Sequence, residues 1–334
     1  MRKPDWLRTA VPSGAEFEAT NERLRAHGIN TVCSSARCPN LAECWGRGTA
    51  TFMILGDTCT RHCRFCAVKT GNPQGAVDGT EPERAAQVVS ELGLRYVVLT
   101  SVDRDDLLDL GAGAFAETVR QVKRAGGRGF KGSGSEPGPQ DPGTLEPLNG
   151  RQSSFVNRHS PIPLVEVLTP DFGGREELIR QVVEAAPDVF GHNLETVERL
   201  SSSVRDPRAS YRRSLEVLAT VKRVAPKMTT KSGLMVGLGE TDDELRQALR
   251  DLRSFGCDVV TVGQYLQPAR RCLPVERYVT PEEFAALERE ALVMGFMGAL
   301  CGPLVRSSYR AAELAVPPLN SQVPIPNSQS SPNA

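Results

Sequence analysis

Short apolar runs alternate with longer amphipathic segments along most of the chain. Short runs rich in Val, Ile, Leu and Thr predict buried strands, whereas apolar residues three and four positions apart predict helices. The predicted strands are Thr51–Leu55, Tyr96–Thr100, Leu164–Leu168, Val189–His192, Gly233–Val236 and Val259–Gly263. The predicted helices include Glu81–Leu92, Ala114–Arg124, Arg175–Ala186, Pro207–Val224 and Asp242–Phe255. This alternation predicts an α/β fold with a parallel sheet, either open or closed into a full or partial barrel.

Two capping boxes mark where two helices begin. Thr241 is followed three residues later by Glu244, and Thr280 by Glu283, with Pro281 at the first helical position. In a capping box the hydroxyl and the carboxylate each accept a backbone N–H at the helix start. We therefore expect helices to begin directly after both threonines.

Two segments show neither the apolar pattern of a helix nor that of a strand. Residues from about Gly126 to Pro163 are crowded with Gly, Pro and Ser, and the tail from Pro317 repeats Asn-Ser-Gln among prolines. Loops this long without secondary structure are uncommon inside compact domains. We interpret about 127–161 as a low-complexity insertion and 317–334 as a disordered tail.

Composition limits the classes of function. The chain has 334 residues, 40% of them hydrophobic, and a formal net charge of zero, whereas a broad nucleic-acid-binding face needs a basic excess. The longest apolar stretch, Ala291–Leu300, is too short to cross a bilayer. No targeting segment is apparent before Trp6. We expect a cytoplasmic protein (or one of an organelle matrix, if this is a mature form) that binds neither nucleic acid nor membrane.

The cysteines carry the chemical signal. One trio, Cys59, Cys63 and Cys66, is spaced C-x3-C-x2-C after the first predicted strand, and the other, Cys33, Cys38 and Cys44, is spaced C-x4-C-x5-C. Neighbouring thiolates can converge on a soft metal centre, and iron–sulfur clusters are held by cysteine thiolates. Each trio is one ligand short of the four that a cluster needs. The sequence therefore predicts redox chemistry at the carboxyl ends of the strands.

Structural zinc is the main alternative, because C-x2-C spacing is common at zinc sites. Such sites usually add histidine, and His62 is the only histidine near either trio, where we interpret it as a bystander. Disulfides are not expected in a long chain without a secretory segment, and Cys257 is predicted to be a core residue. A zinc-stabilised binding module without catalysis remains open on these residues alone.

The first trio, with Phe65 before its last cysteine, resembles the radical S-adenosylmethionine superfamily. Within it, the chain resembles the lipoyl synthase family from Lys3 to about Tyr309, apart from the insertion. The stretches that carry this resemblance are Cys38–Asn40, Glu43–Trp45, Thr49–Asp57, Thr100–Asp106, Glu166–Phe172, Gly263–Pro268 and Gly302–Tyr309. The second trio and the Arg-Ser-Ser-Tyr element at 306–309 set this family apart within the superfamily.

The resemblance implies a partial (β/α)6 TIM-type barrel and two 4Fe-4S clusters. Cys59, Cys63 and Cys66 would hold the catalytic cluster, whose open iron binds S-adenosylmethionine. Cys33, Cys38 and Cys44 would hold the auxiliary cluster, the sulfur donor, with Ser308 favoured over Ser307 as its fourth ligand and Arg306 and Tyr309 beside it. The implied domains are an extension at 1–48 carrying the auxiliary trio, a barrel at 49–302, and a closing segment at 303–316.

The implied reaction inserts two sulfur atoms, at C6 and C8, into an octanoyl chain on a lysine of a lipoyl carrier domain. Unactivated C–H bonds require hydrogen-atom abstraction, which a 5′-deoxyadenosyl radical from S-adenosylmethionine performs. The implied partners are the carrier domains of 2-oxoacid dehydrogenase complexes, the glycine-cleavage carrier protein, an electron donor of flavodoxin or ferredoxin type, and iron–sulfur carrier proteins.

The resemblance also implies contacts to S-adenosylmethionine after successive strands. Thr100, Ser101 and Asp103 would lie near its amino group, and Asn193 and Glu195 near its ribose. Gly233 and Gly237 would let the backbone approach the adenine, and Phe65 and Gln264 complete the set. By default, however, the charged run Asp103–Asp106 is a solvated loop face.

Some residues depart from the family pattern. Leu108 and Leu110 stand where Pro and Gly are common, and Cys272 and Cys301 also replace other residues. Cys301 is close enough to Ser308 in sequence to be a second donor to the auxiliary cluster. The alternative within enzymes is another radical sulfur-inserting enzyme, similar to biotin synthase or to a methylthiotransferase.

Overall fold

The computed structural model describes residues 2–8, 15–35, 38, 40–46, 51–127 and 162–314. Apart from Gly127, the predicted insertion lies outside these ranges, as does the predicted tail. None of the helices within them is long and apolar enough to cross a membrane.

One curved sheet organises the described part of the chain. Its strand order, β1-β2-β5-β6-β7-β8-β9-β10, follows the order of the sequence. The strands are β1 (Asn30–Thr31), β2 (Thr51–Ile54), β5 (Tyr96–Ser101), β6 (Leu164–Leu168), β7 (Val189–Gly191), β8 (Thr229–Val236), β9 (Val259–Gln264) and β10 (Gly298–Gly302). Neighbours pair in parallel except β1, which is antiparallel to β2. The predicted α/β fold with a parallel sheet is confirmed.

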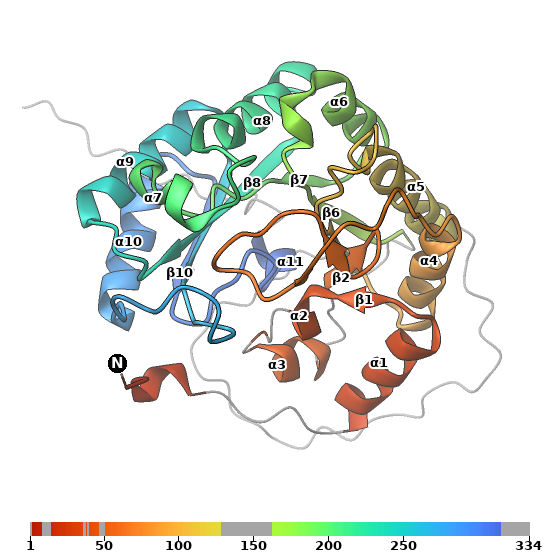
Figure 1. Cartoon of the computed structure of the whole chain (residues 1–334), viewed down its shortest axis with the longest axis horizontal. Helices are drawn as coiled ribbons and strands as arrows, with labels where there is room; N and C mark the ends of the chain where they lie inside the picture. The colour runs from red at the N-terminus through yellow and green to blue at the C-terminus, as the bar shows by residue number, and fades with distance from the viewer. Residues whose placement is uncertain are drawn as a thin grey trace, which may run out of the picture.

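Helices follow the strands and cover the outside of the sheet. They are α4 (Glu81–Glu91), α5 (Ala112–Gly127), α6 (Glu176–Glu184), α7 (Glu198–Val204), α8 (Tyr211–Val224), α9 (Asp242–Ser254) and α10 (Pro281–Val293). In Figure 1 the strands form an arc with α4, α5, α6, α8, α9 and α10 around it. Both predicted capping boxes are present, Thr241 with Glu244 at α9 and Thr280 with Glu283 at α10.

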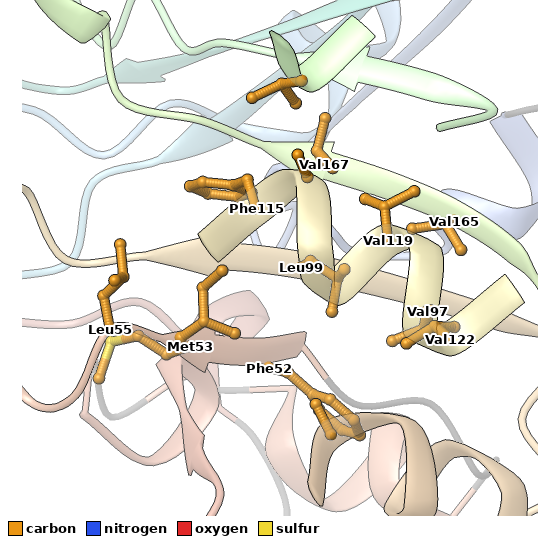
Figure 2. Close-up of a cluster of buried hydrophobic side chains, with 14 of the residues drawn as sticks. Phe52, Met53, Leu55, Val97, Leu99, Phe115, Val119, Val122, Val165 and Val167 are labelled. Atoms are coloured by element: carbon orange, nitrogen blue, oxygen red, sulfur yellow. The ribbon is translucent and has the colours of Figure 1, made fainter. Parts of the chain in front are cut away.

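The outer layer is held by apolar side chains on alternate strand positions. Figure 2 shows α5 lying across β5 and β6, and the residues that meet there are Phe115, Val119, Val122, Val97, Leu99, Val165 and Val167, each fully buried. Burying one such large side chain contributes about 1.5–3 kcal/mol. Because strand residues alternate between faces, Val98 and Glu166 point to the inside of the arc.

Early helices of the chain lie at the open side of the arc, and the last described helix lies inside it. The N-terminal helices α1 (Ala15–Ala26), α2 (Val32–Ser35) and α3 (Leu41–Gly46) lie near β1 in Figure 1, and α11 (Ala311–Leu314) lies inside the arc. Ala311 packs there with Tyr96 and Val98 of β5. The segment from β10 to α11 therefore passes through the interior of the partial barrel.

Two strands of this sheet, β1 and β10, are additional to the six predicted. β10 falls partly in the apolar stretch Ala291–Leu300, and it is defined by its register with β9, in which Gly298 is opposite Val259. β1 is likewise defined by its pairing with β2. β8 begins at Thr229 rather than Gly233, and α8 begins after the Ser210 cap rather than at Pro207. Strand pairing across the sheet decides such boundaries, and the local pattern does not contain it.

Candidate functional site

A cavity of about 630 Å³ opens inside the arc, and cysteines of both trios line it. This volume is within the roughly 300–1,000 Å³ typical of small-molecule sites. Its wall contains most of the predicted site residues: Cys33, Cys38, Cys59, Cys63, Phe65, Cys66, Thr100, Ser101, Asp103, Asn193, Glu195, Gly233, Gln264, Arg306, Ser307 and Ser308. Cys44 and Gly237 are not in the wall. Cys44, in α3, packs with Cys38 against the adjoining core.

The first trio lies on a loop whose two ends are paired. β3 (Thr58–Cys59) and β4 (Lys69–Thr70) form a small parallel sheet at either end of this loop. The Gly71 N–H also donates to the Cys59 carbonyl at 2.9 Å. In Figure 1 this part of the chain, in orange, lies across the inside of the arc. The loop is therefore closed on itself before it meets the barrel.

Each sulfur of the first trio accepts one backbone N–H. Arg61 donates to Cys59 Sγ at 3.4 Å, Asp206 to Cys63 Sγ at 3.4 Å, and Val68 to Cys66 Sγ at 3.5 Å. Such donors stabilise thiolate charge and tune a bound cluster. Burial, reinforced by the nearby Asp103 carboxylate, raises the pKa of the Cys59 and Cys63 thiols to about 12 despite these hydrogen bonds. Metal binding at this loop must therefore displace thiol protons.

Arg61 fastens this loop to the ends of two strands. Its guanidinium donates to Asp105 at 2.9 Å and to Asp171 at 2.8 Å, and lies 3.3 Å from Asp103. Asp103 and Asp105 follow β5, and Asp171 follows β6. Asp103 in turn lies 3.8 Å from Cys59 Sγ. Burial raises the pKa of Asp103 to about 6, against the opposing effect of Arg61.

The default interpretation of Asp103–Asp106 as a solvated face is wrong. Arg104 is only 2% exposed, donates to Asp106 at 2.8 Å, and also donates to the Leu55 carbonyl at 3.3 Å. With the contacts of Arg61, these bonds make the run a packed junction between β5 and the cysteine loop. By contrast, Leu108, a few residues further, is 95% exposed.

The predicted cofactor contacts differ in how far their polar groups are already used. Ser101 Oγ is buried without a hydrogen-bond partner in the described ranges, so it is available to a ligand. Thr100 Oγ1 donates to the Leu168 carbonyl at 2.9 Å. Asn193 Nδ2 donates to Glu195 at 3.1 Å and to Ser307 Oγ at 2.7 Å. Burial raises the pKa of Glu195, which favours its neutral form.

Gly233, Gly237 and Gln264 make close contacts within the protein itself. A Cβ on Gly233 would lie 2.7 Å from Ser307 Oγ, so this glycine admits the closing segment. Gly237 has φ +94, and a Cβ there would meet Gln264 Nε2 at 2.2 Å. Gln264 Nε2 donates to three backbone carbonyls, and its Oε1 accepts the Val279 N–H. Its expected contact with the cofactor stays a prediction, and its amide already fixes the segment after β9.

The second trio is tied to the closing segment. Thr51 Oγ1 donates to Ser308 Oγ at 2.8 Å. Burial raises the pKa of Cys33, while hydrogen bonding with Thr51 opposes this rise. Outside the cavity, Asn40 Nδ2 donates to the Leu304 carbonyl at 2.6 Å. One threonine therefore reaches both Cys33 and Ser308.

Further contacts join the same two segments. The hydroxyl of Tyr309 donates to Glu43 at 3.0 Å, and Arg310 lies 3.6 Å from the same carboxylate. Ser307 instead points to Asn193, on the side of the predicted cofactor contacts. The two serines thus face different parts of the cavity.

The buried Trp45 indole and the half-buried Arg306 guanidinium, both beside the second trio, fit an anionic group held by thiolates. The Trp45 indole N–H has no acceptor within the described residues, although the ring is 2% exposed and next to Cys33. Arg306 has no carboxylate partner among the described residues, and its guanidinium donates to its neighbour's carbonyl, that of Val305. Burial lowers the pKa of Arg306, and Cys38 opposes this effect. A charge that is largely removed from water normally has a partner, and a thiolate-held cluster would provide one.

Some cysteines lie differently from what was expected. Cys301 packs with the α9–α10 side of the sheet, and its N–H donates to Glu288 at 2.9 Å. It is not in the cavity wall and its side of β10 packs toward α10, so this position gives no support to its expected role as a second donor to the auxiliary cluster. Cys272 Sγ donates to the Cys66 carbonyl at 3.4 Å. Cys257 is fully buried, as predicted, and the His62 side chain is exposed.

Three residues of the site were not singled out from the sequence. Arg61 was overlooked although it stands within the cysteine loop, and Thr51 although it stands in a stretch that carries the family resemblance. Asp171 also stands in such a stretch. The available signal was the position of each beside a cysteine or at a strand end.

Within the described ranges no three His, Cys, Asp or Glu side chains converge as the ligands of a single ion would.

Comparison with known protein families agrees with this site. A model of the radical SAM superfamily matches residues 53–252, and a model of the N-terminal domain of lipoyl synthase of the radical SAM family matches residues 1–38. A lipoyl synthase from Halorhodospira halophila is 50% identical over 310 residues, covering 93% of this chain and 83% of that protein. One from Pyrobaculum calidifontis is 50% identical over 315 residues, covering 94% and 96%.

Solved structures support the fold. The FeFe-hydrogenase maturase HydG from Carboxydothermus hydrogenoformans matches with a TM-score of 0.55 and 12% identity, covering 90% of this chain and 69% of its own. Methylornithine synthase (PylB) matches with a TM-score of 0.50 and 12% identity, covering 82% and 73%. At such low identity these likenesses speak only for the shared fold.

Proposed function

Because the chain belongs to the lipoyl synthase family of radical SAM enzymes, we propose that it inserts sulfur at C6 and C8 of an octanoyl chain on a lipoyl carrier domain. The observation that carries this proposal is the meeting of residues from both trios, strand-end polar residues and Ser308 in the wall of one cavity. Family membership disfavours both the zinc-stabilised module and the enzymes similar to biotin synthase or to a methylthiotransferase.

Cys59, Cys63 and Cys66 would hold the 4Fe-4S cluster to which S-adenosylmethionine binds. When bound, this cluster supplies the electron that cleaves the sulfonium to methionine and the 5′-deoxyadenosyl radical. Ser101 offers its free hydroxyl to the cofactor, while Asp103 and Glu195 offer half-buried carboxyl groups. Arg61 holds the cysteine loop against the strand ends and so fixes where the cofactor lies.

Cys33, Cys38 and Cys44, with Ser308, would hold a second 4Fe-4S cluster, and this cluster supplies the two sulfur atoms. Thr51 orients Ser308, and Arg306 places its positive charge beside Cys38. An alkoxide is a harder ligand than a thiolate, so Ser308 suits a bond that must be released. A cluster that gives up its own sulfur needs such a ligand.

Apolar residues of the wall suit an octanoyl chain and shield a reactive species. They include Val32, Met53, Val102, Leu168, Leu234 and Tyr265. Excluding water and other hydrogen donors directs abstraction to the bound substrate. The carrier must remain outside, because the cavity is far smaller than a protein domain, and it must present only its modified lysine.

The domain boundaries and partners complete the proposal. The extension, 1–48, contributes the auxiliary trio, the barrel spans 49–302, and 303–316 closes over the auxiliary cluster. Carriers of the 2-oxoacid dehydrogenase complexes and of glycine cleavage are the substrates, and a flavodoxin or ferredoxin supplies electrons. Iron–sulfur carrier proteins would restore the cluster consumed in turnover.

One anaerobic experiment tests the reaction. The enzyme is incubated with dithionite, S-adenosylmethionine and an octanoylated carrier peptide, and the peptide is analysed by mass spectrometry. The expected products are 5′-deoxyadenosine and a peptide carrying two sulfurs on the octanoyl chain. Formation of 5′-deoxyadenosine without any sulfur-containing peptide, by protein loaded with both clusters, would contradict the proposal.

A further inference from the structure

Three exposed arginines lie on the solvent side of the segment that holds the first trio: Arg64, Arg270 and Arg271, here called the arginine lip. Arg64 directly follows Cys63 in the chain, and consecutive Cα atoms are about 3.8 Å apart. None of the three arginines is part of the cavity wall, whereas Cys63 and Cys66 are. The same short segment thus presents thiols to the cavity and positive charge to solvent.

Two segments far apart in sequence build the lip together. The Leu273 N–H donates to the Arg64 carbonyl at 2.9 Å. Arg271 Nη2 donates to the carbonyls of Ala67 at 2.9 Å and Val68 at 3.3 Å, and Cys272 Sγ donates to the carbonyl of Cys66. These bonds fix the segment after β9 to the outside of the cysteine loop, so the charges have defined positions.

The charge of the lip is uncompensated within the described residues. Arg64 donates to the Ser203 carbonyl and Arg271 to the two loop carbonyls, and none of the three arginines pairs with a described carboxylate. Some exposed arginines elsewhere around the barrel do have acidic partners, among them Arg199 with Glu244, Arg208 with Asp206, and Arg277 with Glu283. A positive patch that is left unpaired raises the rate of encounter with an acidic partner.

The position of the lip indicates what that partner must do. A partner that delivers a substrate chain has to reach the cavity, and the lip is outside the cavity wall. A partner that delivers only an electron needs to approach the cysteine loop closely and needs no opening. The lip is on the outer side of that loop, directly beside two of its three cysteines.

We propose that the arginine lip is the docking surface for an acidic one-electron donor protein of flavodoxin or ferredoxin class. This inference rests on the proposed function, because it requires an iron–sulfur cluster on Cys59, Cys63 and Cys66. In the encounter, the reduced donor loses one electron and this cluster gains it, and no atom is transferred. The carrier domain then approaches through the cavity opening, so the two partners use separate surfaces.

The test variant reverses two charges of the lip, Arg64→Glu with Arg270→Glu. Arg271 is kept because its side chain also bonds the loop backbone. The matched control is Arg95→Glu with Lys227→Glu, which changes the net charge by the same amount. Both control residues are exposed and precede strands, Arg95 before β5 and Lys227 before β8, at the opposite end of the sheet.

Two readouts are compared at low ionic strength. Binding of oxidised flavodoxin to the cluster-loaded enzyme is measured by titration, and 5′-deoxyadenosine formation is measured with either reduced flavodoxin or dithionite. For the lip variant we expect flavodoxin binding and flavodoxin-driven turnover to fall by about tenfold or more, with less salt dependence than the wild type. Dithionite-driven turnover should stay within about twofold of the wild type, and the control should retain both activities.

Three outcomes would overturn the inference. Unchanged flavodoxin binding would show that the lip is not the docking surface. An equal loss with dithionite would show that the arginines act on the cysteine loop itself. A loss confined to assays with a whole carrier domain, with dithionite and a short peptide still giving normal turnover, would assign the lip to the carrier. Failure of the proposed function is distinct, because the wild type would then make no product with dithionite.

Discussion

Thr51 donates a hydrogen bond to Ser308 across 2.8 Å, although the two residues are 257 positions apart in the chain. Thr51 begins β2, whereas Ser308 belongs to the segment that passes inside the arc after β10. The same threonine also interacts with Cys33, where its hydrogen bonds counter the rise in thiol pKa caused by burial. Thr51 therefore contacts both Cys33, a proposed sulfur ligand, and Ser308, the proposed oxygen ligand, of one cluster.

The two serines should respond differently to substitution. Ser308→Ala should keep the first cluster and 5′-deoxyadenosine formation but impair sulfur insertion, because the oxygen ligand beside Cys33 is lost. Ser307→Ala should be milder, since its hydroxyl faces Asn193. Iron content and yield of dithiolated peptide measure both effects. The reverse order would move the ligand to Ser307, and no loss in either variant would exclude a serine ligand.

Thr51 is predicted to position Ser308 through its hydroxyl. Thr51→Val, similar in shape but without a donor, should lower sulfur insertion by about tenfold, as removal of groups that orient metal ligands usually costs 10–100-fold. Thr51→Ser keeps the donor and should restore most of the yield. The measured quantity is product formed per 5′-deoxyadenosine released. If valine and serine gave the same ratio, the hydroxyl would have no role.

Arg61 is predicted to hold the cysteine loop in place. Arg61→Met leaves Asp171 and Asp105 without their main partner, and Asp171 has no exposed side-chain surface. Breaking such a buried pair from one side costs about 3–5 kcal/mol. We expect a lower urea midpoint and faster iron loss under anaerobic conditions, with a smaller effect for Arg61→Lys. Arg213→Met is the control, because Arg213 lies 3.8 Å from Asp171 and is more exposed.

A second buried pair lies inside the arc, away from the cysteines. Lys231 Nζ donates to Glu166 at 2.9 Å, and the Tyr96 hydroxyl donates to the same carboxylate at 2.5 Å. Lys231→Met alone leaves a buried carboxylate without its cation and should reduce the free energy of unfolding by about 3–5 kcal/mol.

Replacing both charges, Lys231→Met with Glu166→Leu, should cost clearly less than the single change. Urea unfolding followed by circular dichroism measures both variants. A double variant as unstable as the single one would show that shape, rather than the uncompensated charge, decides the loss.

The sequence predicts what local patterns encode. The capping boxes of α9 and α10 depend on residues three apart, and both are present. The three cysteines of the first trio lie within eight residues of one another, so the sequence alone predicts their shared loop. Contacts such as Thr51 with Ser308, or Arg61 with Asp171, join distant segments and leave no local period. β10 was missed for the same reason, because its register with β9 defines it.

For Cys301 and Gln264, the sequence did not show which neighbours their side chains contact. Cys301 is near Ser308 in the chain, but the alternation of side chains along β10 turns it toward α10. Gln264 lies in the cavity wall and its contact with the cofactor stays a prediction, but the sequence did not show that its amide also bonds the backbone of the segment after β9. Proximity in sequence and residue type alone do not determine which face a side chain takes.

The central claim is that the two cysteine trios serve one cavity with different tasks. Cys59→Ala and Cys38→Ala separate these tasks, and Cys257→Ala, in the core away from the cavity, is the control. The measurement is 5′-deoxyadenosine and dithiolated peptide from the same anaerobic reaction with dithionite and S-adenosylmethionine. The control should form both products.

Cys59→Ala should form neither product, because S-adenosylmethionine then has no intact cluster to receive an electron from. Cys38→Ala should still form 5′-deoxyadenosine, at a reduced rate, and no dithiolated peptide, because the sulfur donor is absent. If both variants lost 5′-deoxyadenosine formation equally, or if Cys38→Ala still made dithiolated peptide, the division of labour between the trios would be contradicted.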